Sequence, residues 1–201
     1  MPTEPPGVKE SAVWQDDTTH VVGASGRSGA ALCRALLAEG MPLKDFRRIA
    51  EAMVEVARDE NEPVRQVEAL RLKLGALIVQ TIVPVKMPLP VITLDAQLET
   101  LLAQAVRAGP GATHPFEPAL ASRLVAAISE SAAPLVNQAR RFAIVTSPIA
   151  RRPLARLMKP HLPEVPVMSF LEIPDGKPVE VMAVVGNPPP QLAEPAPALA
   201  S

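Results

Sequence analysis

The chain has 201 residues, of which 48% are hydrophobic, so it can bury a core as one domain or two small ones. Its 20 Lys and Arg residues nearly balance 21 Asp and Glu residues, and the formal net charge of -1 excludes a general attraction to nucleic acid or anionic membranes. A single cysteine, Cys33, excludes an internal disulfide and a thiolate metal cage, which is typical of a reducing compartment such as the cytoplasm.

The first part of the chain contains a glycine-rich stretch that allows two interpretations. Gly23, Gly26 and Gly29 recur at intervals of three, after two valines and before an apolar run. This spacing resembles a dinucleotide-binding loop, in which glycines let the backbone approach a pyrophosphate at a helix N-terminus. Such a unit needs a second apolar strand ending in an acidic residue, whereas this chain continues into an amphipathic helix. We favour a flexible lead for residues 1–30 and keep an NAD(P)-binding protein as the alternative.

The next part of the sequence has helical periodicity. Apolar residues at helical spacing predict one helix from Pro42 through Ala57 and a second from Pro63 through Thr81. Three prolines follow within the stretch Pro84–Pro90, where extended backbone is expected because proline lacks a donor and restricts the residue before it. This stretch is the predicted boundary between two subdomains.

Beyond the boundary the pattern becomes mixed. Val91–Thr93 is a short predicted strand, and Asp95 is a candidate N-cap for the helix that follows. A further helix ending before Pro134 is indicated by apolar residues at helical spacing: Leu120, Leu124 and Ile128.

The C-terminal third reads as strand, helix, strand, turn and strand. Ser147 and Pro148 could begin the helix, although Pro153 would then lie inside it, so the helix either bends there or begins at Pro153. The three predicted strands are Phe142–Val145, Val165–Met168 and Val179–Val185. The whole pattern predicts an α+β fold, with a helical subdomain followed by a small α/β subdomain that has a three- to four-stranded sheet. The proline-rich residues 187–201 are expected to be a disordered tail.

Catalytic and metal-binding patterns are not found in the sequence. His20, His114 and His161 lie in different segments, and Cys33 lies in an apolar stretch typical of a buried small residue. We therefore predict no catalytic, cofactor-binding or metal-binding residues and no enzyme. No apolar run approaches the roughly 20 residues of a membrane span, so we also expect a soluble chain without direct membrane insertion.

Basic residues are concentrated in one segment of the C-terminal third. Arg151, Arg152 and Arg156 follow the first strand of that region, with Arg140, Arg141 and Lys159 close by. Guanidinium groups on one helix can bind the carboxylates of an acidic partner. A solvated helix face is the alternative interpretation.

Three segments resemble one protein family in detail and in order: LLAEGMPLKDFRRIAEA at 36–52, LPVITLDAQLETLL at 89–102, and the long C-terminal stretch 141–186, which ends in FLEIPDGKPVEVMAVVG. They resemble the FHIPEP family, the export-gate proteins of type III secretion, and its flagellar branch in particular. The resemblance covers roughly residues 31–186 and the C-terminal cytoplasmic part of the family only. The chain is therefore expected to be a fragment or a truncated relative.

The resemblance implies a domain organisation and partners. Residues 31–88 would form a ring-building helical subdomain with its linker, residues 89–186 would form the C-terminal α/β subdomain, and the chain would act in homo-oligomeric assembly and in docking of export substrates or chaperones. Its expected location is the cytoplasm, at the inner-membrane export apparatus, whose components are further expected partners. Self-association would include Arg47, Arg48 and Glu51 on the polar face of the first helix. The injectisome branch and a stand-alone helical adaptor are alternatives.

Overall fold

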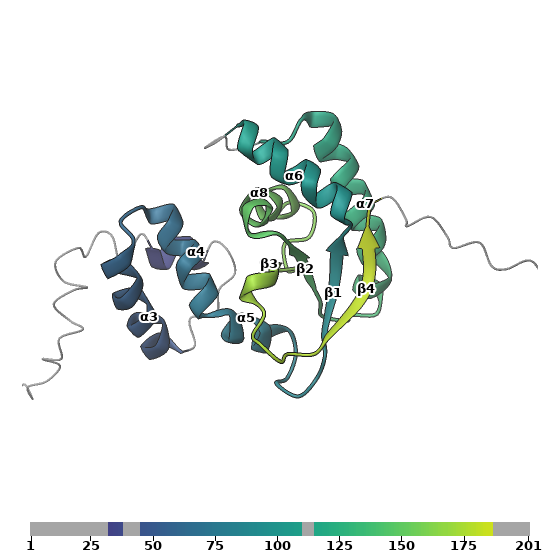
Figure 1. Ribbon diagram of the computed structural model, residues 1–201. Helices are drawn as coiled ribbons and strands as arrows, with labels where there is room; N and C mark the ends of the chain where they lie inside the picture. The colour runs from purple at the N-terminus through teal and green to yellow at the C-terminus, as the bar shows by residue number, and fades with distance from the viewer. Residues whose placement is uncertain (1–31, 38–44, 110–114, 187–201) are drawn as a thin grey trace, which may run out of the picture.

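A computed structural model describes residues 32–37, 45–109 and 115–186 of the chain. Helices form the N-terminal part, and a parallel sheet with its covering helices forms the C-terminal part (Figure 1). The predicted α+β fold, with the helical part first and the small sheet second, is confirmed.

The sheet has four parallel strands in the order β3-β2-β1-β4. Val91 in β1 lies opposite Ala143 in β2 and Val181 in β4, and Ile144 in β2 lies opposite Val167 in β3. All four predicted strands are present, with the bounds β1 (Leu89–Leu94), β2 (Ala143–Thr146), β3 (Val167–Ser169) and β4 (Val179–Val185).

One face of the sheet is covered by three helices: α6 (Ala96–Ala108), α7 (Pro118–Asn137) and α8 (Pro148–Met158). Ile92 and Ile144 point to this face and share a buried core with Leu102, Leu124 and Leu154 from the three helices. Asp95 is the N-cap of α6, as predicted, because its side chain accepts a hydrogen bond from the Leu98 backbone N–H at 2.6 Å.

Two helices continue through prolines. The prediction that α7 ends before Pro134 is wrong, since the helix runs to Asn137, and α8 begins at Pro148 with Pro153 inside it. An internal proline costs a helix about 3 kcal/mol. Burial of Leu135 in α7 and of Leu154 in α8 offsets this cost, because both side chains belong to the core under the sheet.

Helix α7 is also long and apolar enough, by length and composition, to cross a membrane. Its buried residues, however, lie along the stripe that faces the sheet: Leu124, Ile128, Ala132 and Leu135. The helix therefore packs one stripe against the sheet, while 22% of its most apolar window is buried in all.

The helical part contains a short helical segment at residues 32–37 and then α3 (Phe46–Asp59), α4 (Pro63–Lys73) and α5 (Gly75–Ile82). Helix α3 is capped by Asp45, whose side chain accepts a hydrogen bond from the Arg48 backbone N–H, while the predicted start at Pro42 lies outside the described residues. The Glu55 carboxylate on α3 accepts a hydrogen bond from Lys73 on α4 at 2.6 Å, which lowers the pKa of Glu55.

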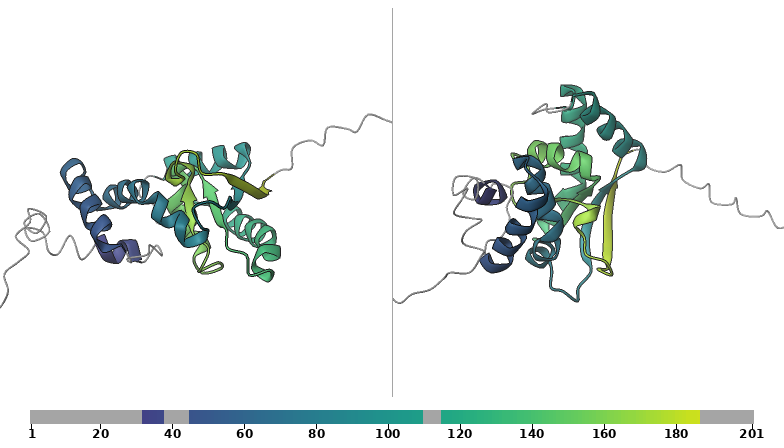
Figure 2. Two further views of the ribbon diagram at one scale, coloured as in Figure 1. Left: turned by 90° about the horizontal axis from the view of Figure 1, so that it is seen from below. Right: turned by 60° about the vertical axis from the view of Figure 1, so that its left-hand side comes forward.

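The single helix predicted from Pro63 through Thr81 is divided in two. Leu74 leaves helical geometry, with φ -98° and ψ 7°, and α5 starts in a new direction at Gly75. The break lets α5 turn onto the sheet while α3 and α4 project away from it (Figures 1 and 2).

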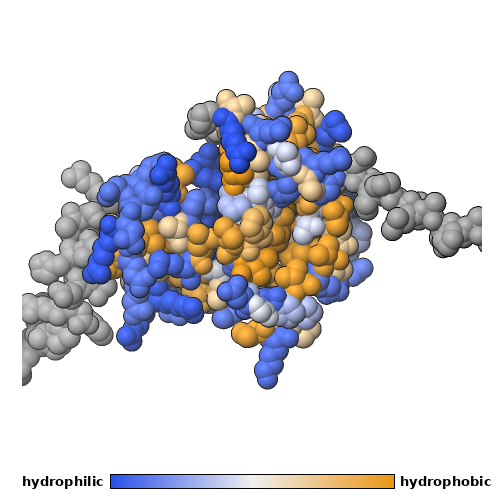
Figure 3. All heavy atoms as spheres, viewed as in Figure 1, coloured by the Kyte–Doolittle hydropathy of each residue, from blue (hydrophilic) through white to orange (hydrophobic). Residues whose placement is uncertain are grey.

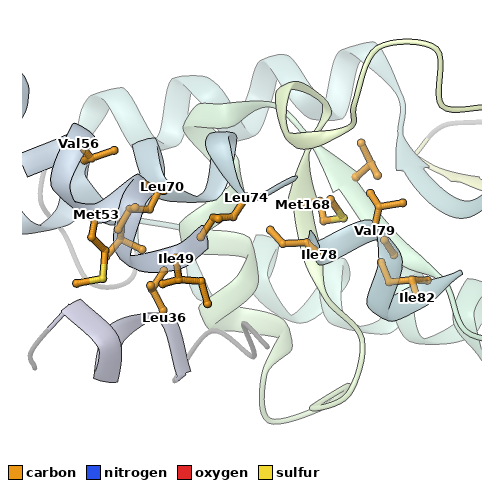
Figure 4. Packing of buried hydrophobic residues seen from close by; sticks show 14 of the residues in the cluster. Leu36, Ile49, Met53, Val56, Leu70, Leu74, Ile78, Val79, Ile82 and Met168 are labelled. Atoms are coloured by element: carbon orange, nitrogen blue, oxygen red, sulfur yellow. The ribbon is translucent and has the colours of Figure 1, made fainter. Parts of the chain in front are cut away.

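Helix α5 covers the second face of the sheet. Ile78, Val79 and Ile82 pack in one buried cluster with Met168 of β3 (Figure 4). Val91 of β1 belongs to the same cluster. The same cluster continues through Leu74 and Leu70 to α3. The helical part and the sheet therefore share a core across the predicted boundary, and β1 already begins inside that boundary at Leu89.

Limited trypsin digestion should cut the described part of the chain first at Lys86. Residues Pro84 to Met87 are exposed, and exposed loops are cleaved before packed elements. The two pieces should still elute together on size exclusion, because their side chains share one core.

The Lys177→Ala variant tests the same loop. The Lys177 ammonium donates hydrogen bonds to the carbonyls of Pro84 and Val85 at 3.1 and 3.0 Å, so its loss should speed the cut. First cleavage between Phe142 and Met168 instead would contradict the packed sheet.

Candidate functional site

A cluster of buried charges lies where α4 and α8 meet η1, a short 3-10 helix (Phe170–Glu172). Arg71 on α4 is 2% exposed and Glu172 is 1% exposed. The Arg71 guanidinium donates through Nη2 to Glu172 Oε2 at 2.7 Å and to the Val167 carbonyl at 3.2 Å, and through Nε to Glu172 Oε1 at 3.3 Å. Glu172 Oε1 also accepts a hydrogen bond from the Ser169 backbone N–H at 3.2 Å.

Arg151 on α8 completes this buried charge cluster. Its Nε donates to Glu68 Oε2 at 3.0 Å, its Nη2 contacts Glu68 Oε1, and its Nε lies 3.8 Å from Glu172 Oε1. The side chain is 1% exposed. Both interpretations of Arg151 from the sequence placed it on the surface, whereas the structure places it inside, between two carboxylates from segments distant in sequence.

The buried charge cluster joins the helical part to the sheet. Glu68 and Arg71 come from α4, while Arg151 and Glu172 come from the elements that flank β2 and β3. Arg71, Arg151 and Glu172 are almost fully buried, where unpaired charges would be strongly unfavourable, and the fold pairs them with one another and with Glu68, whose side chain is 33% exposed. The cluster thus links the helical part to the sheet through ion pairs, beside the apolar core that the two parts share.

A cleft of about 1280 Å³ opens beside the cluster, and cations line much of it. We call it the basic cleft. Its cationic lining residues beyond the buried cluster are Arg140, Arg141, Arg152, Arg156 and Lys159, with His161 next to them. Among the described lining residues Glu164 is the one carboxylate, and accessible apolar walls come from residues such as Val136, Leu162 and Val165. The cleft can therefore accept an acidic ligand that also carries an apolar group.

The cations of the basic cleft differ in their present partners. Arg140 pairs with Glu180 at 2.5 Å, and Arg141 donates to the Thr81 carbonyl at 2.7 Å. Lys159 donates to the Pro163 carbonyl at 3.2 Å, and the exposed Arg156 lies one helical turn before Lys159. Arg152 is half-buried. The structure thus brings Arg152 and Arg156 into one cleft, which Arg151 also lines while its buried guanidinium pairs with Glu68.

The predicted self-association residues lie on α3, on a different element. Arg47 Nε and Glu51 Oε1 are 2.9 Å apart, with side chains 90% and 55% exposed, and Arg48 is also exposed. Phe46 beside them is exposed as well. This polar face with one aromatic residue is available for contact with another molecule.

An apolar surface lies over the front of the sheet in the view of Figure 3. Helix α5 covers β1 to β3 on this face, whereas β4 is left partly open at Val179, Val181 and Val184. Phe170 and Leu171 of η1 are exposed too.

Other residues singled out in the sequence carry no site among the described residues. Gly23, Gly26, Gly29 and the histidines His20 and His114 lie outside the described residues. Cys33 packs half-buried against the core that contains α3.

Glu68, Arg71 and Glu172 are site residues that were not predicted from the sequence. A weak signal existed, because Arg71 lies between apolar residues in ALRLKL and Glu172 lies inside the apolar run SFLEI. Charges inside apolar runs are candidates for buried, paired positions.

The chain is similar to proteins of type III secretion. The FHIPEP family matches residues 23–178, which include the glycine-rich stretch. The flagellar biosynthesis protein FlhA of Salmonella typhimurium LT2 is 33% identical over 152 residues, or 76% of this chain and 21% of that protein. The secretion system apparatus protein SsaV of Salmonella typhimurium 14028s is 25% identical over 165 residues, or 82% and 24% of the two chains. The chain thus spans about a fifth of the length of these curated relatives.

Solved structures share the fold. Shigella flexneri MxiA has a TM-score of 0.70 at 22% identity, covering 84% of this chain and 55% of that one. The nonameric EPEC SctV-C has a TM-score of 0.66 at 18% identity, and the match covers 84% of this chain and 56% of the SctV-C chain. CdsV in the Chlamydia pneumoniae CdsV and CdsO complex has a TM-score of 0.65 at 20% identity, covering 84% and 49%.

Proposed function

Because the chain belongs to the FHIPEP family, we propose that it acts in type III protein export as a non-enzymatic assembly and docking module, on the cytoplasmic side of the inner-membrane export apparatus. The observation that carries this proposal is the family match over residues 23–178, which spans both the helical part and most of the sheet. The fold shared with export-apparatus proteins supports it.

Assembly is the role proposed for the helical part, residues 31–88. The structurally similar EPEC SctV-C is nonameric. Arg47, Arg48 and Glu51 provide an exposed polar face on α3 for contact with a second copy or a full-length relative. Such a contact is weak for separate molecules and strengthened when a scaffold raises their local concentration. We expect the separate 201-residue chain to be chiefly monomeric at micromolar concentration.

Docking is the role proposed for residues 89–186. The structurally similar CdsV forms a complex with CdsO. In this chain the basic cleft presents Arg152 and Arg156 beside apolar walls, which suits acidic segments of export substrates, chaperones or apparatus components. The higher identity to FlhA than to SsaV favours a flagellar role over an injectisome role.

Co-purification with a full-length relative tests the assembly proposal. The tagged chain, produced in flagellated cells that contain the 33%-identical FlhA, should be recovered with FlhA from solubilised membranes. Exchange of Arg47 and Arg48 for glutamate should reduce recovery by about tenfold, which corresponds to roughly 1.4 kcal/mol of lost contact energy. The matched control is Arg107→Glu with Arg123→Glu, which changes the charge equally at exposed positions on α6 and α7, outside the proposed surface.

Two results would contradict the proposal. Recovery of no FlhA with the unmodified chain would remove the assembly role. Equal loss with the control pair would show that net charge, and not the α3 surface, governs recovery.

A further inference from the structure

The basic cleft has a chemistry that specifies its occupant. Arg156 and Lys159 are exposed at its rim, and the accessible apolar walls come from Val136, Leu162 and Val165. A cleft of about 1280 Å³ is large enough for several side chains of a peptide. A matching peptide carries carboxylates next to a large apolar side chain.

The chain itself contains such a peptide near its N-terminus. Residues 1–20 carry four carboxylates, Glu4, Glu10, Asp16 and Asp17, and one lysine. The sequence AVWQDD places Trp14, the single tryptophan of the chain, two and three positions before Asp16 and Asp17. Tryptophan is the residue type most suited to anchor a contact in an apolar pocket, and its ring also attracts arginine.

The position of the cleft puts this segment within reach. Ala35, from the helical segment at residues 32–37, lines the cleft. Asp17 precedes Leu32 by fifteen positions (32 minus 17), and a chain of that length can span up to about 50 Å. A tether of this kind provides an effective concentration on the order of millimolar, so even a weak contact is populated.

We propose that residues 1–20 bind in the basic cleft of the same molecule, with Trp14 against the apolar walls and the carboxylates of Asp16 and Asp17 facing Arg156 and Lys159. An acidic partner of the cleft must displace this segment before it can dock. That consequence rests on the proposed function, whereas the intramolecular contact does not.

The fluorescence of Trp14 tests the contact directly, because the chain contains one tryptophan and no tyrosine. If the dissociation constant of the segment for the cleft is near the effective concentration, the segment occupies the cleft in about half of the molecules. Acrylamide should then quench the fluorescence of Trp14 in the chain roughly half as well as it quenches the free 1–20 peptide. High salt should raise quenching to the peptide value, since exposed charges are screened.

Charge-reversal variants test whether Trp14 is protected by the basic cleft. Arg156→Glu with Lys159→Glu should expose Trp14 to full quenching, and so should Asp16→Lys with Asp17→Lys, which leaves every packed residue unchanged. Joining all four changes in one chain should restore protection. The control pair Arg58→Glu with Arg123→Glu lies outside the cleft and should leave quenching unchanged.

Three results would overturn the proposal. Quenching in the unmodified chain equal to that of the free peptide would show that the segment does not bind. Protection that survives both reversals would place Trp14 on another surface. Protection lost on about hundredfold dilution would show that the cleft holds the segment of a second copy. None of these readouts involves an export partner, so the proposed function is tested separately.

Discussion

Replacing Glu172 with alanine is expected to destabilise the folded chain by about 3–5 kcal/mol, because loss of one partner leaves uncompensated charge in the interior. Arg71 Nη2, 2.7 Å from Glu172 Oε2, would lose its carboxylate while only 2% exposed. Arg151 would keep Glu68 but lose the second carboxylate at 3.8 Å. The Ser169 backbone N–H would lose its acceptor as well.

Urea unfolding followed by circular dichroism gives the free energy of unfolding for this comparison. The matched control is Glu180→Ala, which removes the partner of Arg140 in a pair whose side chains are 36% and 44% exposed. An exposed ion pair contributes about 0–1 kcal/mol to stability, so the free energy of unfolding of the control variant should stay close to that of the parent chain. Equal effects of the two substitutions would show that the buried charge cluster does not hold the helical part to the sheet.

The strands of this fold could be predicted from the sequence because their signals are local. Phe142–Val145 and Val179–Val185 are apolar runs bounded by turn residues, and Asp95 has an N-cap side chain at the start of a periodic helix. The corresponding elements, β2, β4 and α6, can therefore be predicted without knowledge of the residues that pack against them.

The errors have a non-local cause. Pro134 and Pro153 end helices by local preference, but the buried stripes of α7 and α8 keep both helices continuous. The break at Leu74 is set by packing, because α5 must turn to cover the sheet face that contains Val91 and Met168. Propensity alone carries no information about such contacts.

The candidate site could be predicted only in part for the same reason. Clustering of arginines in sequence indicated a basic surface, and Arg152 and Arg156 do line one cleft. The burial of Arg151 depends on Glu68, which lies 83 positions away in sequence. A helical pattern of charges cannot show which arginine faces a distant carboxylate, so Arg151 could not be separated from its neighbours.

The Gly75→Ala substitution is expected to destabilise the chain, against the usual preference of helices for alanine. In a helix interior without tertiary contacts this change would be stabilising by about 1 kcal/mol, and at Gly75, the first residue of α5, the gain would be at most that. A Cβ atom at Gly75, however, would lie 1.9 Å from the carbonyl oxygen of Glu172 and 2.8 Å from its carbonyl carbon. Backbone atoms cannot rotate away as a flexible side chain can. Either α5 or η1 must move, and overpacking of this kind costs about 1–3 kcal/mol or more.

The movement would also disturb the buried charge cluster, because Glu172 carries both the blocked carbonyl and the carboxylate that binds Arg71. Urea unfolding should therefore show a lower midpoint for Gly75→Ala than for the parent. Gln80→Ala, an exposed position on the same helix, is the control and should stay within about 0.5 kcal/mol of the parent. If Gly75→Ala were as stable as the parent or more so, helix propensity would govern this position, and the close approach of α5 to η1 would not be a determinant of the fold.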